Sequence, residues 1–111
     1  MSVKIERINS NIMKEISYIL ETEVKDEKIK FVTITDCKVT NDLSYAKIYF
    51  TCLNDDKKEE TLEALNRAKG FIRKKLGEKI DIRYIPELQF VYDESIENGK
   101  KIEEIINEIN R

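Results

Sequence analysis

Histidine is absent from this 111-residue chain, and so is tryptophan. Without histidine the chain lacks the commonest general base and the commonest metal ligand, which disfavours most imidazole-dependent enzymes and metal sites. Glycine occurs three times and proline once, and no glycine belongs to a phosphate-binding glycine-rich string. We therefore expect no catalysis, no cofactor and no bound metal.

Cysteine and long apolar runs are also scarce. Cys37 and Cys52 are far apart and flanked by β-forming residues, so we expect small buried side chains rather than a disulfide or a metal clip. No run approaches the length of a membrane span, and the first residues do not form the apolar stretch of a secretory signal. We expect a cytoplasmic protein that does not enter a membrane.

Charge is what the chain has in abundance, because 38% of its residues are charged. The net charge is only −2, but residues 66–84 hold seven cations and two anions, a net charge of +5 that leaves −7 for the remainder. The length is that of one ordinary domain. We therefore predict a single domain, residues 1–111, with a basic face set against an acidic body.

Hydrophobic periodicity predicts the order α-β-β-α-β-α. The first helix is expected at residues 3–24, where isoleucines recur every three or four positions. Runs of β-branched and aromatic residues predict strands at residues 31–35, 45–52 and 88–92. The first two should pair antiparallel across the Asn41-Asp42 turn. A last helix, capped by Asp93, would align Ile96, Ile102, Ile105, Ile106 and Ile109 on one face.

The ends of the middle helix have recognisable signals. Asp56 and Glu59 have the spacing of a capping box, so the helix is expected to start near Lys57. Gly77 has the position of a C-cap that ends it.

The apolar pattern of this helix predicts an irregularity in its middle. Its apolar stripe is formed by Leu62, Leu65, Ile72 and Leu76. A straight helix would place Lys69 inside the stripe and turn Phe71 away from it. A kink or break at Ala68-Lys69-Gly70 removes both conflicts, and Gly70 supplies the backbone freedom. The alternative is an unbroken helix in which the Lys69 stem lies over apolar surface.

The cations around the expected kink are the candidate binding site. Basic side chains and exposed amides at a broken helix can contact a nucleic-acid backbone. The candidates are Arg67, Ala68, Lys69, Gly70, Arg73, Lys74 and Lys75, with Arg7, Lys79 and Arg83 as weaker ones. Five neutralised phosphates would give a log-log salt slope of about −3.5 to −4.5. The alternative is that these cations form an ordinary solvent-exposed face of a helix and bind no ligand.

The predicted strand at residues 45–52 offers a second possible contact. Tyr45, Lys47 and Tyr49 should share one face of the sheet, and tyrosine rings can stack on bases. Tyrosine is equally an ordinary strand residue, so β-propensity already accounts for both rings.

Four stretches of the chain carry a resemblance to a known family. They are Arg7-Ile8, Ile12, Glu15-Ile16 and Ile19-Leu20; Val32-Thr33-Ile34-Thr35 with Asp42-Leu43 and Ala46-Lys47-Ile48-Tyr49; Ala68-Lys69-Gly70-Phe71-Ile72-Arg73 with Leu76-Gly77; and Pro86-Glu87-Leu88 with Phe90, Asp93, Ser95, Gly99 and Ile102. In order and spacing the chain resembles bacterial ribosome-binding factor A over essentially its whole length.

The resemblance implies a type II KH-like α+β domain with a three-stranded sheet and helices packed on one face. In this family an Ala-x-Gly helix-kink-helix replaces the Gly-x-x-Gly loop of other KH domains, and Ala68-Lys69-Gly70 matches it. The implied function is binding to the immature small (30S) ribosomal subunit and its 16S ribosomal RNA. The factor would assist late maturation, including processing of the RNA 5′ end, without catalysis, and would support growth in the cold. We expect a monomer. Glu27 stands where many relatives have proline, which leaves this function untouched.

Two other functions stay open on the sequence. In the first, a protein-interaction module, the acidic C-terminal helix or the first helix docks a partner without RNA contact. In the second, a carboxylate-based enzyme, acidic pairs such as Asp55-Asp56 and Glu103-Glu104 hold a divalent ion. These pairs sit at helix starts and on polar helix faces, where capping and solvation explain them.

Overall fold

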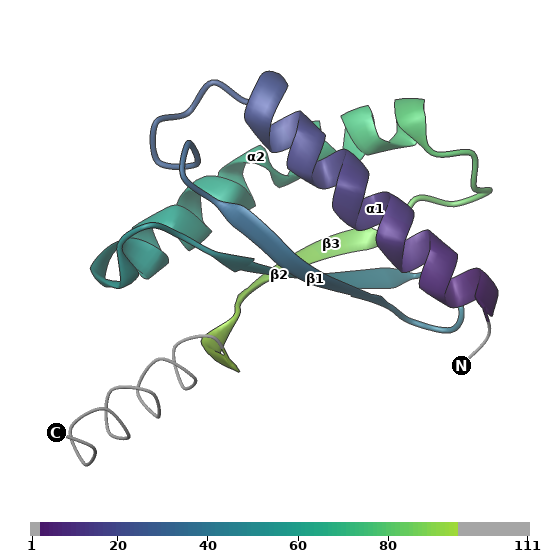
Figure 1. The fold of residues 1–111 in the computed structure, drawn as a ribbon. Helices are drawn as coiled ribbons and strands as arrows, with labels where there is room; N and C mark the ends of the chain where they lie inside the picture. The colour runs from purple at the N-terminus through teal and green to yellow at the C-terminus, as the bar shows by residue number, and fades with distance from the viewer. Residues whose placement is uncertain (1–2, 96–111) are drawn as a thin grey trace, which may run out of the picture.

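The computed structural model describes residues 3–95, which form two helices and a three-stranded sheet (Figure 1). The elements in chain order are α1 (Val3–Thr22), β1 (Thr33–Val39), β2 (Tyr45–Thr51), a single 3-10 turn η1 (Asp55–Lys57), α2 (Lys58–Lys79) and β3 (Glu87–Tyr92). The predicted α+β class is confirmed, together with the order of these elements. The predicted last helix, from Ile96 to Ile109, lies outside the described residues.

The sheet has the order β1-β2-β3. β1 and β2 pair antiparallel, as predicted, and β3 pairs parallel to β2 because α2 carries the chain back across the sheet between them. A bulge between Ile34 and Asp36 shifts the register of β1. β1 begins two residues later than expected, because Phe31 lies in the preceding turn with 59% of its surface exposed.

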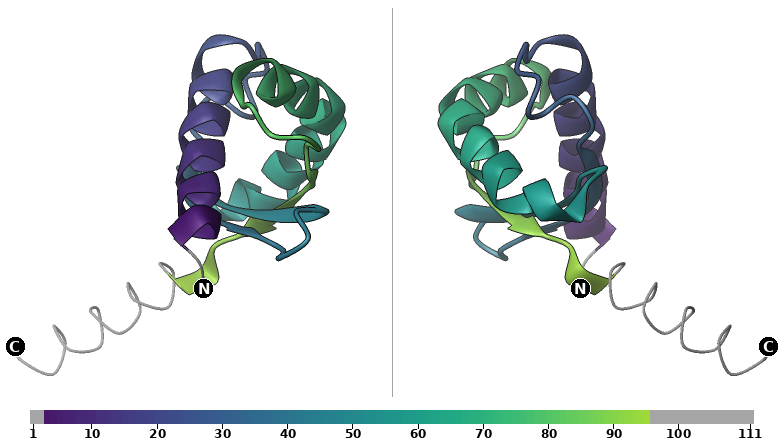
Figure 2. Two further views of the ribbon diagram at one scale, coloured as in Figure 1. Left: turned by 90° about the vertical axis from the view of Figure 1, so that its right-hand side faces the viewer. Right: turned by 90° about the vertical axis from the view of Figure 1, so that its left-hand side faces the viewer.

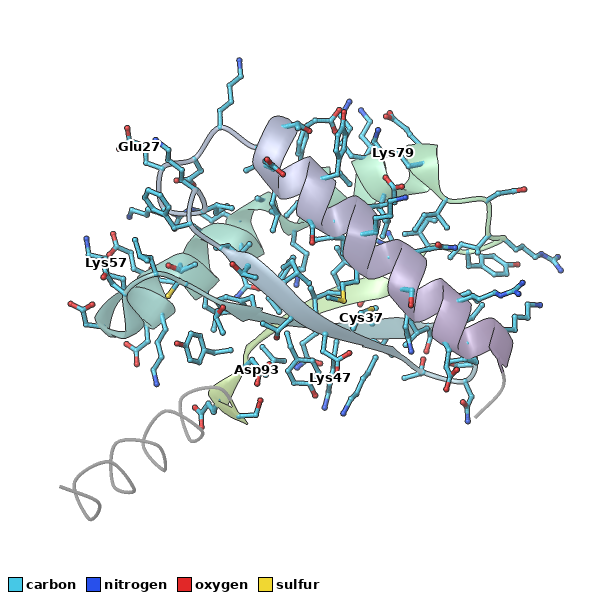
Figure 3. All side chains as sticks on the ribbon, in the orientation of Figure 1. Glu27, Cys37, Lys47, Lys57, Lys79 and Asp93 are labelled. Carbon is cyan, nitrogen blue, oxygen red and sulfur yellow. The ribbon has the colours of Figure 1, made fainter. Side chains whose placement is uncertain are left out.

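Both helices cover the same face of the sheet (Figures 1 and 2). The core between the layers contains buried side chains from both helices and all three strands. The fully buried ones include Ile12, Ile16 and Ile19 of α1, Ile48 and Phe50 of β2, and Leu65, Ile72 and Leu76 of α2. Alternation along β2 turns Tyr45 and Lys47 to the opposite face, where both are exposed. Figure 3 shows Lys47 on this side, away from the helices. In the described part of the chain, the expected packing of helices on one face is confirmed.

The start of α2 differs from the expected capping box. The 3-10 turn η1 occupies the residues immediately before α2, so Asp56 lies inside that turn. Lys57 is the N-cap residue, and no side chain caps the first turn. The capping-box prediction is therefore wrong. The acidic residues Glu59 and Glu60 stand in the first turn, where they still interact favourably with the helix dipole.

The end of α2 also differs, because the helix continues through Gly77 to Lys79. Ile80 is the extended C-cap residue, and its amide donates a 3.0 Å hydrogen bond to the Leu76 carbonyl. Gly77 does not adopt a positive φ, so the C-cap prediction is wrong. What this glycine supplies is space: a Cβ at this position would lie 3.3 Å from Cγ1 of Ile85.

The middle of α2 bends without breaking. The helix is continuous from Lys58 to Lys79, so the predicted break at residues 68–70 does not occur. Seen from either side in Figure 2, however, its ribbon changes direction between the teal first part and the green second part. Gly70 lies within this helix with a negative φ and an exposed backbone.

Two small residues explain why the sequence suggested a break. Thr61 is 4% exposed and Ala68 is partly buried against the core. With them included, the buried stripe runs through Thr61, Leu65, Ala68, Ile72 and Leu76 at steps of three or four residues, which one continuous helix accommodates. Lys69 is exposed at the edge of this stripe rather than inside it, and Phe71 stays 43% exposed. A stripe built only from large apolar residues was displaced from the real one.

Candidate nucleic-acid interface

Three of the predicted site residues form an outward row on α2. Arg67, Gly70 and Lys74 follow one another at i, i+3 and i+7, on the side of the helix opposite the buried stripe, and all three are exposed. Among the described residues, neither cation takes part in an ion pair. A Cβ built on Gly70 meets no atom within 4 Å. The row therefore presents two unpaired cations with an open stretch of backbone between them.

Neither its backbone conformation nor a close neighbour requires glycine at position 70. Glycine inside a helix costs about 1 kcal/mol relative to alanine. The positive φ that would justify this cost is absent, and so is a close neighbour that would clash with a side chain. The remaining explanations are the bend of α2 and close approach of another molecule to the backbone.

A second row, Lys69 and Arg73, lies one helical turn apart on the side of α2 that faces the connection to β3. Lys69 is exposed, and no ion pair in the described part of the chain involves it. Arg73 donates from Nε to the Pro86 carbonyl at 3.2 Å and from Nη2 to the Ile85 carbonyl at 2.7 Å. Its guanidinium is thus committed in part to holding the chain before β3.

Two more predicted cations are turned toward aromatic rings. The ammonium group of Lys75 lies 3.6 Å from Oε2 of Glu78 and 5.7 Å from the centre of the Phe71 ring. Figure 3 labels Lys79 at the end of α2. Its ammonium group lies 4.8 Å from the ring centre of Tyr18 on α1. Both side chains cover apolar surface and are less free to bind phosphate than those of the outward row.

The remaining predicted residues occupy three separate places. Ala68 is partly buried and packs against the core, so it contributes to the packing of α2 and not to a contact with a ligand. Arg7 is exposed on α1 and lines a shallow hollow with Glu6, Ser10 and Asn11. Arg83 lies in the connection between α2 and β3. The fold therefore brings together the cations of α2 on adjoining sides of one helix, and leaves Arg7 on another.

The fold and the site can be set beside known proteins. The sequence model of the family described as Ribosome-binding factor A matches residues 4–106. The chain belongs to the ribosome-binding factor A family. It is 47% identical over 110 residues to ribosome-binding factor A of Staphylococcus carnosus (strain TM300), and the match covers 98% of this chain and 96% of that protein. The family resemblance expected from the sequence is confirmed.

Solved structures of ribosome-binding factor A share the fold. The crystal structure of the factor from Thermus thermophilus superimposes with a TM-score of 0.73 at 18% identity, covering 79% of this chain and 94% of that one. A Thermus thermophilus homology model fitted into a cryo-EM map of a 30S–RbfA complex gives a TM-score of 0.62 at 19% identity, with 86% and 97% of the two chains covered. At these identities the likeness concerns the fold.

One exposed aromatic residue beside the basic helix is not among the predicted site residues. Tyr84 is 68% exposed in the connection between α2 and β3, and the guanidinium carbon of Arg83 lies 5.4 Å from its ring centre. The prediction for Arg83 rests on its charge alone. The available signal was an Arg-Tyr pair two residues before the single proline of the chain, in a connection next to the basic helix.

Two grooves elsewhere on the described part of the chain do not contain the predicted site. One of about 720 Å³ lies along the connection between α1 and β1, where Leu20, Val24 and Phe31 contribute apolar lining. A second of about 360 Å³ adjoins the start of α2 beside Leu53 and Lys57. Among residues 3–95, no three His, Cys, Asp or Glu side chains come together to hold a metal ion, and neither helix could cross a membrane.

Proposed function

We propose that this chain binds the small ribosomal subunit and its 16S RNA in the cytoplasm, as a non-enzymatic factor in late maturation that includes processing of the RNA 5′ end. Membership of the ribosome-binding factor A family supports this proposal. So does the Thermus thermophilus relative that has been fitted into a map of a 30S–RbfA complex. Support of growth in the cold belongs to the same proposal.

The observation that carries RNA contact is the outward row of α2. Its cations flank an exposed glycine that the chain does not need for its own packing. A phosphate group can approach the helix closely at a position without a side chain, while Arg67 and Lys74 neutralise its charge from either side. The row is also free of intramolecular ion pairs within the described residues, so binding need not first break one.

The contacts of the individual cations set how steeply binding depends on salt. Among the described residues, the side chains of three predicted cations of α2 make no polar or ring contact: Arg67, Lys69 and Lys74. If these three carry the phosphate contacts, the log-log salt slope is about −2 to −3. This is shallower than the slope expected for five contacts, because Arg73 and Lys75 are engaged within the protein.

The test is charge reversal on the outward row. The double variant Arg67→Glu, Lys74→Glu should lose co-sedimentation with immature small subunits, and its affinity for ribosomal RNA fragments should fall with a salt slope shallower by about 1.4 to 1.8. Both side chains are exposed, so the fold should survive, which circular dichroism and thermal unfolding would check.

The matched control is Lys14→Glu, Lys25→Glu, which reverses two exposed lysines outside α2. It makes the same change in net charge, so it separates a local contact from a general electrostatic effect. If both double variants weaken binding equally, charge rather than the row is responsible. If the outward-row variant binds subunits as wild type does, the RNA-contact proposal fails, and docking through a protein-interaction surface takes its place.

A further inference from the structure

The end of the connection between α2 and β3, immediately after Tyr84, is held by contacts from α2 and the core. The Arg73 guanidinium donates to two consecutive carbonyls, those of Ile85 and Pro86. Pro86 is fully buried, and Ile85 packs against the core and onto the bare backbone of Gly77. These contacts come from α2 and the core, and none of them involves Tyr84. The position of Tyr84 is therefore fixed by its neighbours rather than by its own packing.

Tyr84 stays exposed on this fixed support. A tyrosine ring gains free energy when it is buried, yet 68% of Tyr84 faces solvent while Ile85 and Pro86 beside it are packed inward. The Arg83 guanidinium lies 5.4 Å from the ring centre. An aromatic ring with an adjoining guanidinium is the surface on which unpaired RNA bases stack, and a support that is already ordered reduces the entropy cost of binding.

The connection that carries the Tyr84 ring is anchored to the side of α2 on which Lys69 and Arg73 lie. The side chain that fixes the connection, Arg73, lies one helical turn from Lys69 in the same row. A strand whose phosphates follow Lys69 and the outward row can thus place a base beside the connection. The surface carries positive charge next to the ring, which matches a nucleotide better than an apolar protein side chain.

We propose that Tyr84, supported by Arg83, is a stacking platform for one unpaired nucleobase of the RNA that α2 holds by its phosphates. This inference rests on the proposed function and deepens it, because it makes single-stranded RNA the preferred ligand at this end of α2. Arg73 acts as a positioning residue that keeps the platform in place. The chemistry recognised is a flat π face, so every base can serve and selectivity is for unpaired over paired RNA.

The test uses a short single-stranded RNA that carries a fluorescent purine analogue, together with the duplex of the same sequence. Tyr84→Ala should weaken single-strand binding by about 5- to 150-fold, the range found when one stacking ring is removed. It should also abolish quenching of the analogue, while duplex affinity changes little. Tyr84→Phe should retain both signals, because the ring face is kept. The salt slope should stay at its wild-type value in both variants, since no phosphate contact is lost.

Phe31→Ala is the matched control, because Phe31 is a 59% exposed ring with the Lys30 ammonium group 5.7 Å from its centre, in the connection that precedes β1. It should bind single strands as wild type does. Lys74→Glu separates the two proposals. Loss of binding in Lys74→Glu with unchanged binding and quenching in Tyr84→Ala overturns the platform and leaves phosphate contact standing. Wild-type affinity in both variants overturns both proposals, and equal losses in Phe31→Ala and Tyr84→Ala overturn the platform.

Discussion

Arg73 on α2 and Ile85 before β3 are joined by a 2.7 Å hydrogen bond from Nη2 to the carbonyl oxygen. Together with the bond from Nε to Pro86, it makes a member of the predicted basic cluster part of the framework. A substitution that keeps the positive charge should preserve the function of a residue that only binds phosphate. At a residue that supports the fold, the same substitution should lower the free energy of unfolding.

Arg73→Lys should therefore destabilise the protein although the positive charge remains. A lysine cannot donate from two positions to successive carbonyls, so at least one hydrogen bond to a charged group is lost, at a cost of about 1–2 kcal/mol in this part-exposed setting. Urea unfolding measures the change in the free energy of unfolding. Lys74→Arg, on the outward row, should stay within about 0.5 kcal/mol of wild type. An Arg73→Lys variant as stable as wild type would show that the two hydrogen bonds contribute nothing to the fold.

Substitution by alanine should stabilise the protein at Gly70 but not at Gly77. Gly70→Ala places a methyl group in open space on a helix, so the free energy of unfolding should rise by about 0.5–1 kcal/mol. Gly77→Ala places it 3.3 Å from Ile85, so the same propensity gain is offset or reversed by displacement of that side chain. Thermal unfolding of the two variants side by side measures the difference. Equal stabilisation by both would mean that Ile85 moves aside without cost.

Gly70→Ala also separates stability from function. Under the proposed function the added methyl group obstructs a phosphate at the outward row, so RNA affinity should fall while the melting temperature rises. A variant that is more stable and binds RNA as tightly as wild type would leave the bend of α2, rather than backbone approach, as the reason for this glycine.

The arrangement of layers could be predicted from the sequence because its signals are local. Isoleucines at helical spacing placed α1, and alternation around Ile48 placed β2 with its buried and exposed faces. The continuous stripe of α2 could not be predicted in the same way. Thr61 is buried and Ala68 is partly buried against the core, whereas a hydrophobicity pattern gives little weight to small or polar side chains.

The sequence predicts which cations belong to the candidate site. It does not predict which of them contact other parts of the protein and which are free to bind a ligand. Charge counting predicts that a basic cluster follows Asn66, and the exposed rows of α2 agree with it. That Arg73 turns to a backbone carbonyl and Lys79 to the Tyr18 ring depends on where the next strand and the other helix lie. Those are tertiary contacts, and residue spacing within one helix cannot predict them.

The edge of the sheet at β1 is protected by a side chain of α1. The Val39 amide donates a 2.9 Å hydrogen bond to Oδ1 of Asn9. Asn9→Leu would leave that amide without its partner near the core, which should lower the free energy of unfolding by about 1–3 kcal/mol. Asn9→Asp keeps an acceptor oxygen and should retain most of the stability, and Asn11→Leu, at an exposed position of the same helix, is the control. Urea unfolding compares the three.

Loss of this bond should also change how the protein associates. An edge strand with a free amide can pair with another chain, so Asn9→Leu should aggregate more readily at high concentration than Asn11→Leu does. Light scattering measures this directly. If Asn9→Leu is both as stable and as soluble as wild type, the amide finds another partner and the edge is not guarded by Asn9.

The two thiols should differ in reactivity, and one of them should make stability depend on alkaline pH. Burial, and secondarily the neighbouring Asp36 carboxylate, raises the pKa of Cys37 from 9.0 to about 12. The folded state therefore keeps this proton between those values while the unfolded chain releases it, so the contribution of Cys37 to stability is full below pH 9 and falls as the pH rises toward 12. Cys52 is only partly buried. Iodoacetamide at alkaline pH should alkylate Cys52 in the folded protein and Cys37 only after unfolding. In a Cys52→Ser variant, rapid labelling of the folded protein would mean that Cys37 is reached by solvent and that its proton is not held by burial.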